Sequence, residues 1–573
     1  AIKVVGVAHE ELPITITVSD VLECKTVAGI AFKRGEAFAG PAVAPIQSAR
    51  PHGMLSFGQE RLLFIEGLAN GTSANHLSME FVLSQYTSLN ALENAINFVI
   101  ERHHILHTIY HEDMTQSVLP EWVFTIETVD DVEAFANLPF ELSHDLPLRA
   151  CIYEDSEQVQ RLLIIIHHIA YDGWSTKIFL GDLGLAYEAY QCGTVPDLKD
   201  VEIQYADFAA WERKVVAEDC VAAIDYWKEQ LDGYENLNLL TDKPRPSHHD
   251  YSGADVEVVL TKALSSSLKE LAQMKETTLY SVLISAWYIV LNKTCNQQDL
   301  VIGTPTANRS HPQTHGLIGF LVNSLALRVL INEESMVDEF IALVDDTLQD
   351  AKQYEHLPFD QIVDALKVER DPSRNSIFQA MFALEQDALG GFSLPFAEFS
   401  PAPNDGLSPA KFDLTLIVVD DGDNLKLTLN YATSLFNRPS VQRMLERYQL
   451  VLEQMLVSCN VPIKDLSVLS SEERQHIIST LAPGGQLDLF QEAATSHGVF
   501  EARVSETPHA TAVVFQGKTL SYEQLNMRAN ALANKLVSLE CQGMVGLYLD
   551  RGFEMVVAML AVHKAGCAYV PIS

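Results

Sequence analysis

The chain has 573 residues and carries 76 acidic but only 39 basic side chains, a formal net charge of −37. A surface this acidic repels phosphate backbones and anionic lipid headgroups, which argues against nucleic acid and membrane surfaces as partners. No stretch approaches the roughly eighteen apolar residues of a membrane helix, and no secretion signal opens the sequence. We therefore expect a cytoplasmic protein whose eight cysteines are reduced.

The length points to several domains, because a single hydrophobic core rarely grows past about 250 to 300 residues. Residues 1–34 contain only short apolar faces of helical type, too little surface to fold alone. Residues 35–46, GEAFAGPAVAPI, have the Gly, Pro and Ala content of a linker. We expect the first large domain to begin at about residue 47.

Helix-like and strand-like patterns alternate from 47 to 458, as in ALENAINFVIERHH and RLLIIIH. A segment of this length needs more than one core, and the Pro-rich stretch TDKPRPSHHD at 241–250 interrupts the pattern near its middle. The prediction is a domain of α/β (α+β) class with two lobes, at about 47–225 and 226–458.

A separate unit follows a linker-like segment at 459–485. From 486 to 573 the patterns predict a helix, a strand, a second helix and a second strand. This is half a domain at most, and the sequence stops in the strand-like run AYVPIS. We therefore expect a fragment of a longer protein.

Two histidines, His167 and His168, end the apolar run LLIIIHH, and an Asp-Gly pair, Asp172 and Gly173, follows closely. Side chains alternate along a strand, so the two histidines should point to opposite faces and only one can enter a given cavity. The Asp-Gly pair indicates a tight turn, after which Ser175 or Thr176 is expected to cap the next helix.

A metal site would need two or three ligands on one face, which adjacent strand positions do not supply, so we expect no metal here. A purely structural role for the histidines stays open. However, a polar cluster at the end of a buried strand is costly unless each group is paired, which favours a functional site.

The pattern HHxxxDG resembles the signature of acyltransferases of the chloramphenicol acetyltransferase type, which include the condensation domains of nonribosomal peptide synthetases. The other core motifs of condensation domains have counterparts here in the family's order. They are LSFGQERLLF at 55–64, ERHHILHTIY at 101–110, YADFAAW at 205–211, GTPTANR at 303–309 with LIGFLVNSLALR at 317–328, YEHLPFD at 354–360 and RDPSRNSIF at 370–378. Each motif alone is weakly specific, whereas seven in the right order are strongly so.

Both ends of the chain carry further resemblances. LSYEQLNMRANALA at 520–533 and HKAGCAYVPI at 563–572 are similar to the first two core motifs of an adenylation domain. Residues 1–34 resemble the tail of a peptidyl carrier domain. The resemblance implies a complete condensation domain, folded as two chloramphenicol acetyltransferase-like lobes that form a V with a central tunnel, between a carrier tail and an adenylation start.

The resemblance also implies which cofactors and partners the chain uses. Phosphopantetheine would arrive on partner carrier domains, upstream and downstream, that bear aminoacyl or peptidyl thioesters. The serine that holds such an arm is expected upstream of Ala1, so we expect no covalent cofactor in this chain. The glycine-rich phosphate loop of an adenylation domain follows the second motif, so we expect no productive ATP site either.

In the family's reaction the amine of an acceptor attacks the donor thioester, and the motif residues take distinct roles. His168 is expected to orient the amine and accept a proton, while His167 is structural. Asp172 is expected to hold the motif's shape through an arginine, and Gly173 to let the backbone approach the pantetheine arm. Trp174 is either a core anchor or a wall of the tunnel. Positioning contributes effective molarities of about 10⁵ to 10⁸ M, more than the roughly 10² to 10⁴ of a general base.

The second motif departs from the family pattern, which has an arginine five residues after Arg102 where this sequence has His107. The partner of Asp172 is therefore expected to be His107 when protonated, or another residue such as Arg328 at the end of the fifth motif. Asn323 and Ser56 match motif positions, and we interpret both first as loop and cap residues.

The spacing between carrier tail and condensation domain leaves no room for an epimerisation domain, which favours an L-configured or achiral donor. HHxxxDG also argues against the heterocyclisation variant, which carries paired aspartates. Two alternatives stay open: a non-catalytic condensation-like docking platform, and an acyltransferase that acts on a free small molecule.

Overall fold

The computed structural model describes residues 45–47, 53–69, 73–155, 158–368, 371–386, 394–400, 408–481 and 495–572. The predicted carrier tail and nearly all of the predicted first linker lie outside these residues. The chain divides between Ser470 and Ser471 into two compact units. Within the described ranges, no helix is both long and apolar enough to cross a bilayer.

The first lobe of the larger unit is built on a five-stranded sheet in the order β11-β1-β6-β5-β4. Its strands are β1 (His76–Leu83), β4 (Glu127–Thr128), β5 (Leu148–Glu154), β6 (Gln160–His167) and β11 (Ala397–Ser400). Its helices are α4 (Phe57–Ala69), α5 (Leu89–Arg102), α6 (Val132–Asn137), α7 (Ser175–Gln191) and α8 (Tyr205–Asp219), with a small hairpin of β2 (Thr108–Tyr110) and β3 (Gln116–Val118).

The run LLIIIH lies in β6, the middle strand of this sheet, and apolar clusters cover both faces of the strand. Leu162, Ile164 and Ile166 belong to the main core of the lobe, which includes α5 and α7. Leu163 and Ile165 belong to a smaller cluster on the other face. A strand buried on both sides reads as a continuous apolar run, which explains the five aliphatic residues in succession.

The second lobe is built on a six-stranded sheet in the order β7-β13-β12-β10-β8-β9. Its strands are β7 (Gly253–Val259), β8 (Asp299–Thr306), β9 (Asn323–Leu330), β10 (Ala380–Gln386), β12 (Leu414–Asp420) and β13 (Leu425–Ala432). Its helices are α9 (Val221–Gln230), α10 (Lys262–Met274), α11 (Leu279–Cys295), α12 (Val337–Gln353), α13 (Phe359–Leu366) and α14 (Arg438–Val457). Helix α11 is buried at every position from Ser281 to Asn292, so it forms the centre of the second core.

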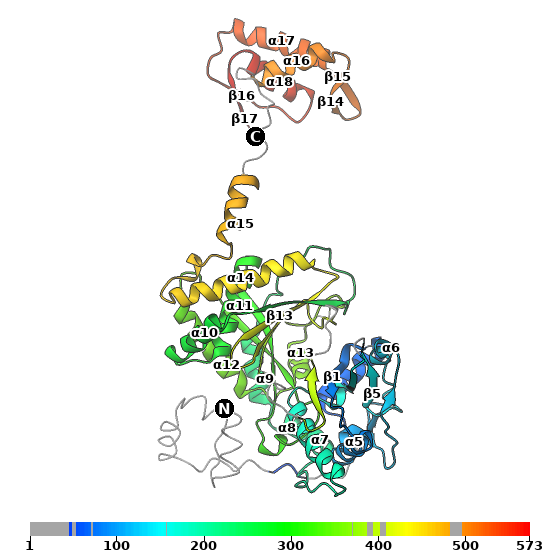
Figure 1. Ribbon diagram of the computed structural model, residues 1–573. Coiled ribbons are helices and arrows are strands. Elements are labelled where there is room, and N and C mark those ends of the chain that lie inside the picture. Colours follow the sequence, from blue (N-terminus) through cyan, green and yellow to red (C-terminus); the bar gives the residue numbers. More distant parts are fainter. Residues whose placement is uncertain are drawn as a thin grey trace. The chain divides into compact units, whose positions relative to one another are not determined.

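Two segments from the second half of the sequence belong structurally to the first lobe. Strand β11 pairs antiparallel with β1 and closes the edge of the first sheet. Leu317, Ile318 and Leu321 also pack in the first lobe's core. The two lobes, coloured blue to teal and green to yellow in Figure 1, are thus joined by crossing segments as well as by the chain between α8 and α9.

The smaller unit contains a compact α/β fold with two short sheets. Its elements are α15 (Ser471–His476), α16 (Ser496–Glu506), β14 (Thr511–Phe515), β15 (Lys518–Ser521), α17 (Tyr522–Ser538), β16 (Met544–Leu547), α18 (Phe553–Lys564) and β17 (Ala568–Pro571). Strands β14 and β15 pair antiparallel, and β16 and β17 pair parallel. Ser521 caps α17 with a capping box that includes Gln524, as the local sequence SYEQ favours.

Candidate active site

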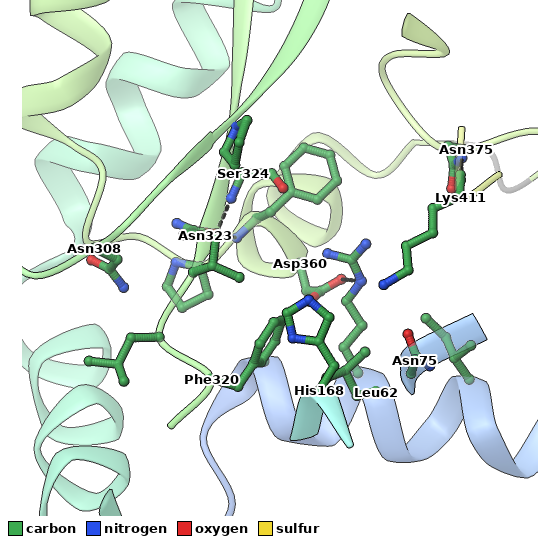
Figure 2. Close-up of a pocket in the computed structure, with 18 of the residues that line it drawn as sticks. Leu62, Asn75, His168, Asn308, Phe320, Asn323, Ser324, Asp360, Asn375 and Lys411 are labelled. Atoms are coloured by element: carbon green, nitrogen blue, oxygen red, sulfur yellow. Dashed lines mark hydrogen bonds and ion pairs between the residues drawn. The ribbon is translucent and has the colours of Figure 1, made fainter. Parts of the chain in front are cut away.

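A cavity of about 240 Å³ lies between the two lobes of the larger unit. From the first lobe it is lined by one face of α4, at Gly58, Arg61, Leu62 and Ile65, the spacing at which helical side chains share a face. His168 also lines it. The second half of the sequence contributes polar and apolar groups, which include Asn308, Phe320, Asn323, Asp360 and Lys411 (Figure 2).

His168 stands at the wall of this cavity because the chain leaves the strand at this residue. Strand β6 ends at His167, and a 3₁₀ turn begins at His168 and ends at Ala170. The Nδ1 atom of His168 lies 2.7 Å from the carbonyl oxygen of Tyr171, so this nitrogen carries the proton. The ring also lies edge-on to Phe320, with centroids 4.9 Å apart. The remaining nitrogen, Nε2, is therefore an acceptor for a group in the cavity.

Burial holds His168 in its neutral form. Desolvation first, then the charge of Lys411, lower the pKa of His168 to about 3. The imidazole is uncharged at neutral pH and accepts a hydrogen bond without having to lose a proton first.

His167 faces away from the cavity, toward the smaller cluster that Leu163 and Ile165 share. Its Nε2 lies 3.3 Å from Oε1 of Glu66, and its Nδ1 accepts a hydrogen bond of 3.1 Å from the amide of Ile169. The two histidine side chains do point to different sides, as predicted. The cause is the turn that begins after His167, whereas the sequence predicted two successive strand positions.

Asp172 is buried and both of its carboxylate oxygens are filled. Arg309 Nη2 lies 3.0 Å from each oxygen, and the amide of Leu321 donates to Oδ2 at 3.2 Å. The amide and hydroxyl of Ser175 donate to Oδ1 at 2.9 and 2.7 Å. Helix α7 begins at Ser175, so the carboxylate of Asp172 serves its first turn, and the predicted capping by Ser175 is wrong.

The partner of Asp172 is Arg309, and the two predicted partners are wrong. His107 stacks on Trp122 at 4.1 Å between ring centroids and places Nδ1 3.0 Å from the carbonyl of Leu119. Arg328 pairs with Asp299, at 2.9 and 2.7 Å between donor and acceptor atoms, on the neighbouring strand. Arg102, the first residue of the departing motif, is also occupied elsewhere: its Nε donates to Asp182 at 2.9 Å.

Arg309 is fully buried and reaches Asp172 from the loop after β8. Its Nη1 donates to the carbonyls of Thr314 and Leu317 at 2.5 and 2.6 Å. Its guanidinium carbon lies 5.6 Å from the ring centroid of Trp174. The indole of Trp174 in turn donates to the carbonyl of His315 at 3.0 Å, so Trp174 anchors the turn against the second lobe.

The family of the chain is decided by comparison with known proteins. Residues 50–478 match the family model described as Condensation domain, and residues 500–573 match the model described as AMP-binding enzyme. This chain belongs to the condensation domain family. The predicted order, a condensation domain followed by the start of an adenylation domain, is confirmed.

Named relatives agree with this assignment. The chain is 34% identical over 540 residues to malpinin synthetase from Mortierella alpina, an alignment that covers 90% of this chain and 7% of that protein. A four-domain nonribosomal peptide synthetase with bound AMP and glycine aligns with a TM-score of 0.69 at 23% identity, over 91% of this chain and 41% of that one. The X-domain from teicoplanin biosynthesis, in complex with OxyB, aligns with a TM-score of 0.66 at 24% identity, over 74% and 98%.

These likenesses confirm the predicted fold class, a mixed α/β condensation fold with a partial adenylation region. The chain spans only 7 to 15% of the length of the curated relatives that it matches. It is therefore similar to a part of much larger synthetases.

Ser56 and Asn323 hold the walls of the condensation domain's cavity. Ser56 Oγ accepts from the amide of Gln59 at 3.1 Å in the first turn of α4, and it lies 2.9 Å from the hydroxyl of Tyr205. Asn323 lines the cavity, while its amide group donates to the carbonyls of Glu355 and Leu357 at 2.8 and 2.7 Å. Ser56 makes the cap contact that was expected, whereas Asn323 begins β9 and binds the carbonyls of a neighbouring loop.

Four residues of the site did not emerge from the sequence reading: Arg309, Phe320, Glu212 and Lys411. A signal existed for each, since Arg309 ends GTPTANR, Phe320 lies in LIGFLVNS, Glu212 follows YADFAAW, and Lys411 opens KFDLTL. Glu212 lines the cavity and accepts from the amide of Phe57 at 3.0 Å, and burial raises its pKa to about 7. In the described part of the chain, no group of three His, Cys, Asp or Glu gathers as a metal site would require.

Proposed function

We propose that this condensation domain forms an amide bond by attack of a carrier-bound aminoacyl amine on an upstream, carrier-bound aminoacyl or peptidyl thioester. The observation that carries the proposal is the position of His168, a neutral imidazole at the wall of a cavity between two lobes. Its Nδ1 is engaged by the carbonyl of Tyr171, which leaves Nε2 to accept a hydrogen bond from the incoming amine.

His168 acts mainly by orientation. An α-amine has a pKa of about 7.7 to 8.0, so roughly a tenth of it is already unprotonated at neutral pH. A histidine whose pKa is about 3 removes a proton poorly before attack. It accepts one more readily once the carbon–nitrogen bond has begun to form and the nitrogen has become acidic.

Asp172 and Arg309 hold the motif in its conformation and do not contact the substrate. Every described contact of the Asp172 carboxylate is with protein donors, so it has no acceptor capacity left for substrate. The ion pair joins the turn after His168 to the loop after β8 of the second lobe. We infer that it holds the two walls of the cavity in register.

The predicted cofactor is the phosphopantetheine of a carrier, which supplies the reactive thioester when it is bound. Gly173 is exposed and is not among the residues that line the cavity, so its role beside the pantetheine arm stays a prediction. The proposed partners are therefore carrier domains upstream and downstream, with phosphopantetheine on each.

A non-catalytic docking platform is the second candidate. It is favoured by one observation, namely that an X-domain with a TM-score of 0.66 to this chain is in complex with a second protein, OxyB. The available Nε2 of His168 and the intact Asp172–Arg309 pair support catalysis instead. An acyltransferase that acts on a free small molecule is a third candidate, and the adenylation start behind the condensation domain counts against it.

The direct test supplies loaded donor and acceptor carriers to the chain and follows the condensed product by mass spectrometry. We expect condensation by the wild type, and a loss of about 10² to 10³-fold in His168→Ala. His144→Ala, at a side chain that is 76% exposed, is the matched control and should keep the full rate. Normal condensation by His168→Ala would refute the catalytic role, and no product with any carrier pair would favour the platform.

The expected donor is L-configured or achiral. The same assay with L- and D-aminoacyl donors on one carrier measures this preference directly. Equal or faster use of the D-aminoacyl donor would contradict the expectation without affecting the proposal of amide formation.

A further inference from the structure

One cation in the cavity has no partner of its own. Lys411 lines the cavity just before β12 begins at Leu414. Its backbone carbonyl accepts from Asn375, but among the described residues its ammonium has no carboxylate within 4.0 Å and no hydrogen-bond acceptor. Figure 2 shows the side chain extended into the cavity on the side where Asp360 and His168 also lie.

Several other lysines of the same unit are paired with a carboxylate. Lys269 lies 2.6 Å from Asp420, and Lys426 lies 2.9 Å from Glu257. A lysine kept for stability reaches such a partner or extends into solvent, because an unpaired ammonium in a protein interior is costly. Lys411 has no such partner among the described residues, and its half-buried side chain extends into the cavity.

The surroundings of Lys411 add positive charge. Arg61, on the α4 face of the cavity, is a second cation, and its Nε is 4.0 Å from the carboxylate of Asp360. Burial first, then the charge of Arg61, lower the pKa of Lys411 to about 8, while Glu66 raises it. Lys411 and Arg61 thus place two cations beside the cavity, and a cation without a carboxylate partner at such a wall attracts an anion.

We propose that Lys411 binds a negatively charged oxygen of the carrier-bound substrate. This inference rests on the proposed function, because it needs a substrate in the cavity beside His168. Two sources supply such an oxygen: a carboxylate on the side chain of a reactant, or the carbonyl oxygen of the donor thioester during attack.

If the oxygen is that of the donor thioester, the reaction passes through a negatively charged tetrahedral intermediate. The amine nitrogen bonds to the thioester carbon, and the π electrons of the carbonyl move onto its oxygen, which becomes negative. Those electrons then re-form the carbonyl, the carbon–sulfur bond breaks, and the thiolate leaves with the proton that the amine gives up. Lys411 would stabilise the negative oxygen while it exists.

The experiment measures condensation by the full chain with donors that differ only in side-chain charge. One carrier is loaded with L-glutamyl, L-glutaminyl or L-alanyl thioester, and each is condensed with a common acceptor by wild type, Lys411→Met and Lys411→Arg. Lys426→Met is the matched control, because Lys426 lies on β13, next to β12, and is paired with Glu257 outside the cavity. We expect Lys411→Met to lose at least about tenfold in kcat/KM and Lys411→Arg to recover most of it.

The pattern of the loss identifies the source of the oxygen. A loss confined to the glutamyl donor indicates a side-chain carboxylate, whereas an equal loss for all three donors with recovery in Lys411→Arg indicates the thioester oxygen. Rates within twofold of wild type for all three donors would overturn the proposal. An equal loss without recovery in Lys411→Arg, or a lowered melting temperature, would show a structural role and overturn it too.

The pH profile separates charge from packing. Because Lys411 is charged below a pKa of about 8, its contribution should fade above pH 8 in the wild type but persist in Lys411→Arg. The ratio of the two enzymes' rates cancels the ionisation of the acceptor amine and of the other titratable groups near Lys411. These groups are Arg61, Glu66, His168, Glu212, Tyr251 and Asp360. Inactivity of the wild type with every donor would contradict the proposed function itself.

Discussion

Asp172 shows how a single carboxylate in a functional motif is used for shape. Its oxygens accept from Arg309, Ser175 and Leu321, so a turn in the first lobe, the start of α7 and a loop of the second lobe meet on one side chain. A buried carboxylate is tolerated only when it is paired and hydrogen-bonded, and this one is both. The stability of this buried cluster therefore depends strongly on the positive charge of Arg309.

Removal of Arg309 is expected to be severely destabilising. Arg309→Met leaves the Asp172 carboxylate buried without its cation, which costs about 3 to 5 kcal/mol of the free energy of unfolding. Urea unfolding followed by tryptophan fluorescence measures this. Arg328→Met, which breaks a partly exposed pair with Asp299, is the comparison and should cost clearly less. A larger effect at Arg328 than at Arg309 would contradict the assignment of the ion pair.

Buried histidines should make the fold sensitive to acid. Desolvation lowers the pKa of His76, on β1, to about 4, whereas the unfolded chain has a value near 6.5. Between these values the unfolded state binds the extra proton, so the stability that His76 permits above pH 6.5 is lost as pH falls toward 4.

The comparison of wild type with His76→Gln isolates this effect from other titrating groups. The stability of wild type relative to the variant should fall by up to about 1.4 kcal/mol per pH unit below pH 6.5, and stay constant above it. Urea midpoints at pH 7, 6 and 5 supply the measurement. A relative stability that does not change with pH would show that His76 is not held neutral by burial.

At the scale of elements, β11 decides how the two lobes are connected. The segment leaves the second lobe after β10 and pairs with β1 at the edge of the first sheet. Just before it, the carbonyl of Phe396 accepts from the amide of Ser84 and the hydroxyl of Thr87 at 2.9 and 2.6 Å. The ring of Phe396 is buried 4.7 Å from that of Tyr187, between centroids.

Truncation of this anchor should loosen the crossing strand. Phe396→Ala is expected to cost about 3 to 5 kcal/mol, because it removes a fully buried aromatic side chain and leaves a cavity. Phe399, on β11 itself but 38% exposed, is the matched control, and Phe399→Ala should cost much less. Unfolding midpoints in urea test both variants, and equal costs would contradict the role of Phe396 as an anchor.

At the scale of the whole molecule, the hydrophobic cores are separate. Every described cluster lies either in the larger unit, as the two lobe cores do, or among residues beyond 496. A chain with separate cores does not unfold in one cooperative step unless the units interact strongly. The two units should therefore unfold in two transitions.

A charge placed in the smaller core tests this independence. Ala561 is fully buried in α18, so Ala561→Asp should abolish the transition of the smaller unit, since an unpaired carboxylate cannot be buried there. The transition of the larger unit and the condensation rate should stay unchanged, because the substituted residue belongs to the core of the other unit. Calorimetry resolves the two transitions, and a shift of both by the same variant would contradict independent units.

The sequence alone determined what depends on local pattern. The apolar run before His167, the Asp-Gly turn and the order of the motifs led to the α/β lobes, the family and the separation of the two histidines. The apolar run and the Asp-Gly turn reflect strand burial and turn chemistry, which act over a few residues, whereas the family followed from the resemblance of the motifs. The two histidines do separate as expected, but at a turn that strand alternation did not predict.

Only the tertiary structure decided which distant groups meet. Arg309 and Asp172 are 137 positions apart, and they pair because the loop after β8 packs against the turn after β6. His107 and Arg328 were reasonable partners by charge, but one is stacked on Trp122 and the other is held by Asp299. Lys411 also lines the cavity because of tertiary packing, since the local pattern of its segment indicates only the start of a strand. Such contacts form where the two lobes pack against each other, and no local sequence pattern indicates which residues will meet there.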